Sequence, residues 1–280
     1  MLRSYASVSK CWIPLCGFKN LRSLQVYNFY GKYALLVEDL VNVLVTSPGL
    51  KVLGLGMQDV KDYGDLPAET LHLGFHAEFL EKLCVDYGSR DGTSPLRLDT
   101  LRLGHVLFLD RRILLDKPNH MFLDKLVHLD GLRSFHVYNG SNHYNRIHDD
   151  LWRVDWSQLK HCKSLQQLSV TRFNKYVRVW MNDYGSTIAD LIVTDWYGSY
   201  APDLDNFDLL ENVHLSMLFI QTKFGTRSEL EGMIYRDVHP RWPYARDDAE
   251  AITILDRLPD GGAHLTRLGL CLDFATHWVC

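Results

Sequence analysis

Long apolar runs are missing from this sequence. Its most apolar segment, residues 33–45, is interrupted by Glu38, Asp39 and Asn42, whereas a membrane-spanning helix needs roughly 20 consecutive apolar residues. Residues 1–18 also lack the continuous apolar block of about 7–15 residues that is typical of a secretory signal. We therefore expect an intracellular protein, cytoplasmic or nuclear, with no membrane partner.

An excess of basic residues is also missing. The chain has 30 Lys and Arg against 34 Asp and Glu, which gives a formal net charge of -4, and it contains no long run of like charge. Proteins that bind nucleic acid normally carry a basic patch or a basic excess, because Lys and Arg neutralise the phosphates. We expect no nucleic-acid partner.

The common catalytic motifs do not occur. The sequence has no GxSxG elbow, no GxxxxGK[ST] or GxGxxG phosphate loop, and no HExxH among its 13 histidines. The nearest cluster of metal-binding residue types is His143, His148, Asp149 and Asp150, whose spacing fits neither a helix face nor a strand face. We expect no metal, no cofactor and no catalysis; an enzyme of unrecognised type is the weakest alternative.

The six cysteines do not form a metal-binding or disulfide pattern. Cys84, Cys162 and Cys271 stand inside apolar segments, where a free cysteine behaves as a small hydrophobic residue. Cys11 and Cys16 are not followed by a second pair of Cys or His at zinc-finger spacing. A structural or incidental role is predicted for these cysteines.

A short pattern recurs along the chain: apolar-x-x-apolar-x-apolar, with residues that favour strands. Nine segments match it, and most successive starts are separated by roughly the 20–29 residues of a leucine-rich repeat or slightly more. The matches begin at Leu21, Leu50, Leu80, Leu98, Leu132, Leu165, Ile188, Leu210 and Leu265.

Amphipathic segments precede several of these matches. Before Leu50, a helical stripe is predicted from six apolar residues, and Pro48 and Gly49 then end the helix. The same order of helix, turn and strand is predicted for residues 156–170 and 247–270. The stripe before Leu50 consists of Leu36, Val37, Leu40, Val41, Leu44 and Val45.

These observations predict an α/β fold, an irregular leucine-rich-repeat-like solenoid. We expect a curved, mostly parallel sheet with short helices on the convex side, because one such unit cannot bury its apolar face without a neighbour. Residues 1–20 form a segment without a recognisable module, and residues 21–280 form one repeat domain of about nine units. The alternative is an ordinary leucine-rich α/β or α+β domain.

The C-terminal unit ends without the polar cap that solenoids normally have. Residues 274–280 include Phe274, Trp278 and Val279. We expect the chain to be a fragment, an incomplete gene product or a piece that docks on another chain, and to be poorly soluble alone.

Side chains of a strand alternate between the two faces of a sheet, so the residues beside the core positions line the concave face. At these positions the sequence is polar, small or aromatic, which is typical of a surface that binds a protein partner. The aromatic-rich residues 172–180 and 195–203 are predicted to be loops at one rim. Their Trp180, Trp196, Tyr197 and Tyr200 are expected to pack over the edge of the solenoid, with an extension of the binding site as the alternative. The predicted partner-binding residues are Tyr27, Asp86, Arg102, His136, Tyr138, Thr171, Thr194 and His214.

The segments "LRLDTLRLGHV", "LKHCKSLQQLSVTRF", "IADLIVTDWYG" and "LDRLPDGGAHLTRLGLCLDF" resemble the leucine-rich-repeat regions of F-box proteins of filamentous fungi. The likeness extends from about Leu21 to the C-terminus. It implies the substrate-recognition part of a ubiquitin ligase receptor, in which the F-box recruits an adaptor and the repeats hold the target protein.

This sequence departs from that group in two respects. An F-box is a helical module of about 40–50 residues that usually opens with Leu-Pro and an acidic residue, and residues 1–20 have no such pattern; "LPAE" at Leu66 is better read as a turn that starts a helix. Regular repeats also often carry Asn or Cys shortly after each strand, and none stands there here. We therefore expect adaptor binding only if a missing F-box is supplied, and a stand-alone scaffold or decoy is the alternative function.

Overall fold

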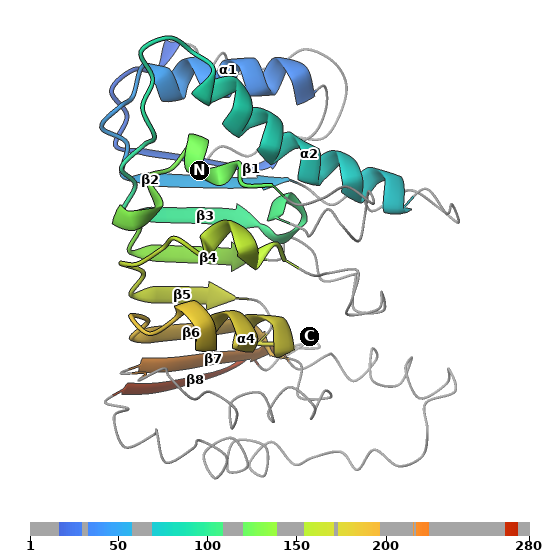
Figure 1. The fold of residues 1–280 in the computed structure, drawn as a ribbon. Helices are drawn as coiled ribbons and strands as arrows, with labels where there is room; N and C mark the ends of the chain where they lie inside the picture. Colours follow the sequence, from blue (N-terminus) through green and yellow to red (C-terminus); the bar gives the residue numbers. More distant parts are fainter. Residues whose placement is uncertain are drawn as a thin grey trace, which may run out of the picture. The chain divides into compact units, whose positions relative to one another are not determined.

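The computed structural model describes residues 17–29, 33–57, 69–108, 120–138, 154–170, 173–196, 215, 217–223 and 267–273. The chain divides into two compact units, Met1–Gln166 and Gln167–Cys280. Each unit combines parallel strands with helices, so the predicted α/β class is confirmed (Figure 1). No helix among these residues has both the length and the apolar character needed to cross a membrane.

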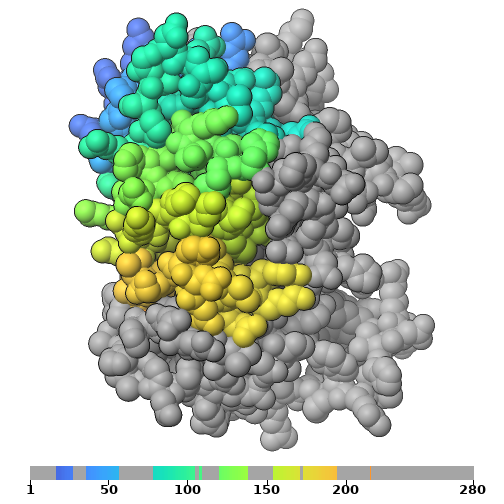
Figure 2. Space-filling model, viewed as in Figure 1, coloured from blue at the N-terminus to red at the C-terminus, as the bar shows by residue number. Residues whose placement is uncertain are grey.

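The first unit contains four parallel strands that pair in chain order. Each pairs with the strand that follows it in sequence, and the register aligns Leu24 with Leu53, Leu53 with Leu101, and Leu101 with Phe135. The described segments of this unit lie side by side as successive colour bands in Figure 2. The strands are β1 (Ser23–Phe29), β2 (Val52–Met57), β3 (Thr100–Gly104) and β4 (Ser134–Tyr138).

Helices and short turns connect the strands of this unit. Helices α1 and α2 contact each other, and α2 also contacts η2 and η3. Figure 1 shows α1 and α2 together at one end of the row of strands. The connecting elements are α1 (Tyr33–Val45), α2 (Glu69–Gly88), η2 (His105–Phe108), η3 (Leu123–Lys125), η4 (Leu129–Gly131) and η6 (Trp156–Leu159).

Alternation along the strands separates a buried face from a polar face. The fourth position of each repeat is buried: Leu53, Leu101 and Phe135 are fully buried, and Leu24 is 8 % exposed. Most of the intervening residues are polar and at least partly exposed: Ser23, Gln25 and Tyr27 in β1, Thr100 and Arg102 in β3, and Ser134 and His136 in β4. The prediction that the spaced apolar residues face the core is confirmed for these strands.

Helix α1 follows its prediction in extent but not in every residue. Leu36, Leu40 and Leu44 are buried as expected, and the helix ends before the turn at Pro48. Val45 is 38 % exposed, whereas Val43 is fully buried. The buried stripe therefore includes Val43 in place of Val45, and α1 also packs against α2.

The repeat match at Leu80 is wrong: this segment belongs to helix α2 and not to a strand. A helix stripe and the repeat pattern both require apolar residues three positions apart, and Leu80 and Leu83 satisfy both. Val85, the residue that a strand would bury next, is 36 % exposed. The buried residues of this part of α2 have helical spacing and are Phe79, Leu80, Leu83, Cys84 and Tyr87.

The second unit contains β5 (Gln167–Val170), α4 (Lys175–Tyr184), β6 (Asp190–Trp196), β7 (Met217–Lys223) and β8 (Arg267–Asp273). Its strands are also parallel and pair in chain order, with Leu168 aligned to Leu191 and Leu191 to Leu218. Since Leu218 is the aligned residue in β7, its repeat begins at the buried Leu215 and not at Leu210. The predicted register was wrong by five residues.

Helix α4 replaces the loop predicted after β5. The side chain of Asn174 accepts hydrogen bonds from the backbone N–H groups of Tyr176 (3.1 Å) and Val177 (3.2 Å) and so caps the helix start. Val177, Trp180 and Met181 are buried. Trp180 therefore packs in the core of this unit, as predicted, but from a helix rather than a rim loop.

Candidate functional site

The predicted partner-binding residues do not all lie where the sequence placed them. Tyr27, Arg102 and His136 lie on β1, β3 and β4 at the polar face. Tyr138 ends β4 and Thr194 lies in β6, as expected for strand residues. Thr171 and His214 lie outside the described residues, as does the cluster from His143 to Asp150.

Asp86 was placed on the sheet, and that placement is wrong. It lies in the last turns of α2, where its carboxylate accepts a hydrogen bond from Lys82 Nζ (2.8 Å), one helical turn earlier. Its position follows from the wrong assignment of the repeat at Leu80. Asp86 is therefore not part of the polar face.

Strand register brings one row of polar-face residues together. The Cα atoms of Gln25, Gly54, Arg102 and His136 are aligned across β1 to β4. Adjacent residues in such a row are close enough for their side chains to interact. We call the set of Ser23, Gln25, Tyr27, Arg102, Ser134 and His136 the Arg102 cluster.

Gly54 provides the space in which the Arg102 cluster forms. A Cβ atom at this position would lie 2.5 Å from Tyr27 Oη and 3.0 Å from Gln25 Cγ. The glycine therefore allows side chains from β1 to lie over β2, toward β3. Any larger residue at position 54 would displace Tyr27.

Gln25 links the aromatic and basic members of the cluster. Its Oε1 accepts hydrogen bonds from Tyr27 Oη (3.0 Å) and Arg102 Nη1 (3.3 Å), and its Nε2 donates to Ser23 Oγ (3.3 Å). Gln25 was not among the predicted site residues, because a glutamine side chain alone does not indicate binding. Its place at the fifth position of the first repeat was the available signal.

Arg102 is incompletely satisfied in this arrangement. Its Nε atom is buried and has no hydrogen-bond partner in the part of the chain that the structure describes. The bond from Nη1 to Gln25 is at the long end of the normal range. The guanidinium therefore retains donor capacity that the described protein does not use.

His136 is neutral at pH 7 in this environment. Burial, and secondarily the positive charge of Arg102, lower its pKa from the ordinary 6.5 to about 4. Its Nε2 shares a hydrogen bond of 2.7 Å with the hydroxyl of Ser134. The cluster therefore presents one permanent positive charge, on Arg102, beside an uncharged imidazole.

This lowered pKa predicts a loss of stability in acid. The unfolded chain binds a proton at His136 near pH 6.5 and the folded chain only near pH 4, so the free energy of unfolding falls between these values. The two pKa values correspond to about 3 kcal/mol, and because solvent screens this partly exposed group we expect a loss of about 2 kcal/mol. Urea unfolding of the native protein and of His136→Gln at several pH values from 7 to 4 will measure it. As the pH falls, the native protein should lose more of its free energy of unfolding than His136→Gln does. Parallel pH curves for the two proteins would contradict the lowered pKa of His136.

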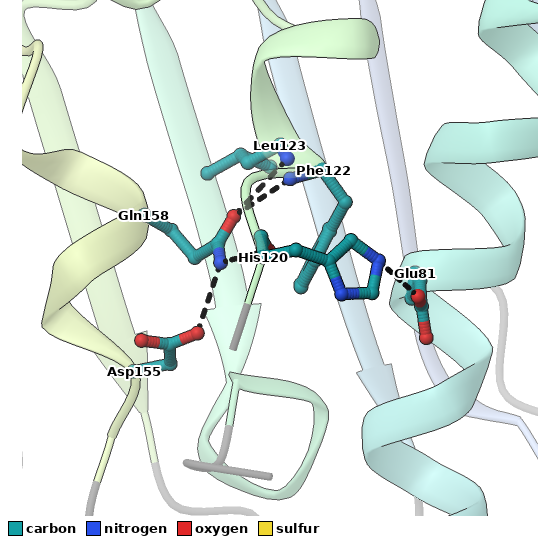
Figure 3. Close-up of polar contacts among 6 residues, drawn as sticks. All are labelled: Glu81, His120, Phe122, Leu123, Asp155 and Gln158. Atoms are coloured by element: carbon teal, nitrogen blue, oxygen red, sulfur yellow. Dashed lines mark hydrogen bonds and ion pairs between the residues drawn. The ribbon is translucent and has the colours of Figure 1, made fainter. Parts of the chain in front are cut away.

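A second polar network lies inside the first unit and is built on Gln158, which is fully buried (Figure 3). Its Oε1 accepts from the backbone N–H groups of Phe122 (3.0 Å) and Leu123 (3.3 Å). Its Nε2 donates to the carbonyl oxygen of His120 (2.8 Å) and to the carboxylate of Asp155 (2.9 Å). All the hydrogen-bonding groups of the amide are occupied, so we assign this network to the structure and not to binding.

Glu81 extends the same region toward the surface. Its carboxylate lies 2.6 Å from Nε2 of His120, which is 54 % exposed (Figure 3). Because the His120 side of this pair is exposed to solvent, the pair is expected to contribute little to stability. It connects helix α2 to the segment that Gln158 holds.

The cysteines of this region are buried rather than reactive. Cys84 and Cys162 are free and buried. Burial raises the pKa of both thiols, that of Cys162 to about 12, so neither forms the reactive thiolate at neutral pH. Among the described residues there is also no group of three His, Cys, Asp or Glu side chains that could hold a metal ion.

Comparisons with known proteins give no relative for this chain. Neither the scan against protein-family models, nor the search of curated proteins, nor that of solved structures found a match.

Proposed function

We propose that this chain is a protein-interaction module that holds a partner protein on the polar face of its parallel strands. The observation that carries this proposal is the Arg102 cluster. It brings together a tyrosine from β1, an arginine with an unused donor from β3 and a neutral histidine from β4, with Gly54 of β2 providing the space between the first two. Tyr and Arg dominate the energetics of many protein interfaces, because they combine large contact area with directed polar groups.

We further propose that the repeats form an irregular leucine-rich-repeat-like solenoid. In favour of this, strands follow one another in sequence order within each unit, and residues such as Leu50, Leu98 and Leu132, which open the repeats, are buried. Stacked repeats of this kind offer an extended surface to a partner.

The link to a ubiquitin ligase rests on the resemblance to fungal F-box proteins alone. On this proposal the chain is the substrate-recognition part of such a receptor. Residues 1–20 lack an F-box pattern, so adaptor binding is expected only from a chain to which an F-box has been added. A stand-alone scaffold would use the same polar face without the ligase.

Affinity capture with matched variants tests the interaction function. Proteins captured from native extract by the full chain should be lost when Tyr27→Ala and Arg102→Glu are introduced together, because both side chains lie on the polar face. Lys160→Glu, at an exposed residue that follows η6, is the control and should retain them. If the double variant still captures these proteins while the Lys160→Glu control loses them, binding uses another surface.

A further inference from the structure

The amino-terminal ends of the strands in the first unit carry a row of charged residues. Backbone hydrogen bonds align them: Lys51 N donates to Arg22 O (2.8 Å), Asp99 N to Lys51 O (2.8 Å), and Arg133 N to Asp99 O (3.1 Å). Three of the four residues are basic. They stand immediately before the strands that carry the Arg102 cluster.

The one acidic residue of this row is already paired. Asp99 Oδ1 lies 3.7 Å from Lys51 Nζ, and both side chains are about half exposed. Arg22 donates from Nη1 to the carbonyl oxygen of Gly49 (3.2 Å), which does not neutralise its charge. The row therefore keeps a local positive excess at Arg22 and Arg133, although the whole chain has a net charge of -4.

Arg102 adds a third unpaired cation on the neighbouring face. No carboxylate among the residues that the structure describes forms an ion pair with it, and its single hydrogen bond, from Nη1, goes to the neutral Gln25. A guanidinium binds a carboxylate best through two parallel N–H groups. A small rotation of the side chain that brings Nε and Nη2 toward a ligand would sacrifice only one long hydrogen bond.

We propose that the partner presents an acidic side chain, Asp or Glu, that binds the Arg102 guanidinium on this polar face. The inference rests on the proposed interaction function and specifies the chemistry of the partner. Arg22 and Arg133 favour an acidic segment through their longer-range field, and Tyr27 provides an aromatic surface beside the carboxylate. A protein carboxylate fits better than a nucleic-acid backbone, because repeated phosphates require a more extended basic surface than this one.

Peptide display provides the test, with the full chain as target and random dodecapeptides as the probe. The selected peptides should share an Asp or Glu at one fixed position. In fluorescence anisotropy, changing that residue to Asn or Gln should weaken binding about tenfold, and Arg102→Gln should do the same. The two changes together should reduce the affinity about as much as either change alone, because both remove the same carboxylate–guanidinium interaction. Lys160→Gln is the control and should leave the affinity unchanged.

The contrary outcomes separate this inference from the proposed function. Peptides that lose affinity on Tyr27→Ala but share no acidic position would overturn the carboxylate and leave the interaction function standing. Peptides insensitive to both Tyr27→Ala and Arg102→Gln would overturn the proposed function itself. Equal or tighter binding of a single-stranded oligonucleotide at the same cluster would show that the ligand is nucleic acid and would also overturn the inference.

Discussion

Replacing Gln158 by leucine is expected to lower the free energy of unfolding of the first unit by about 3–5 kcal/mol. Leucine fills a similar volume but leaves the backbone N–H groups of Phe122 and Leu123 without their acceptor, and it removes the hydrogen bond that Asp155 Oδ2 accepts from Gln158. Each orphaned buried group costs about 1–3 kcal/mol, and more when it is charged. Urea unfolding followed by circular dichroism measures the effect.

Two further variants make this prediction specific. Gln166→Leu, at an exposed glutamine in the same unit, should change the free energy of unfolding by less than about 0.5 kcal/mol. Gln158→Glu keeps the shape but places a second carboxylate beside Asp155, so its loss should be larger at pH 7 than at pH 5. A Gln158→Leu protein as stable as the native one would show that the network is not structural.

Phe135→Ala is expected to cost about 3–5 kcal/mol of stability, because it empties the centre of the core of the first unit. Phe135 is fully buried on β4. Its ring packs edge to face against Phe108 at 5.4 Å and against Trp156 at 6.3 Å between ring centroids. Such contacts add about 0.5–1.5 kcal/mol per pair to the burial of the ring. Urea unfolding followed by tryptophan fluorescence suits this variant, because Trp156 is in direct contact.

The stability lost on substitution of Phe135 should increase with the volume of the cavity that the smaller side chain leaves. Phe135→Leu keeps most of the buried volume and should cost clearly less than Phe135→Ala. Phe18→Ala, at a phenylalanine that is 45 % exposed, should have little effect. An equal cost for leucine and alanine at position 135 would mean that the neighbouring side chains collapse into the space.

The parallel strands could be predicted from sequence because their signal is local and repeated. The spacing of Leu21 and Leu24, or of Leu98 and Leu101, specifies both the strand and its buried face. The same spacing failed at Leu80, where helix and strand patterns coincide over three residues and the packing of α2 against α1 decides. It also failed between Leu210 and Leu215, which both fit the pattern, since only pairing with β6 selects the register.

The candidate site could be predicted in part. Tyr27, Arg102 and His136 followed from alternation along the strands, but their connection through Gln25 depends on the space above Gly54. A glycine in a strand does not indicate which neighbour will fill that space. Gln158 was missed for a different reason: its role depends on backbone groups of residues 120–123, more than thirty positions earlier in the chain.

The pairing of each strand with the one that follows it in sequence affects how the protein is made. β1 has its partner as soon as β2 has emerged from the ribosome, and β3 and β4 then join an edge that already exists. Among the described strands of the first unit, no pairing requires a segment beyond the next strand, so the sheet can grow in the order of synthesis. The nascent polypeptide can therefore acquire its structure progressively during translation.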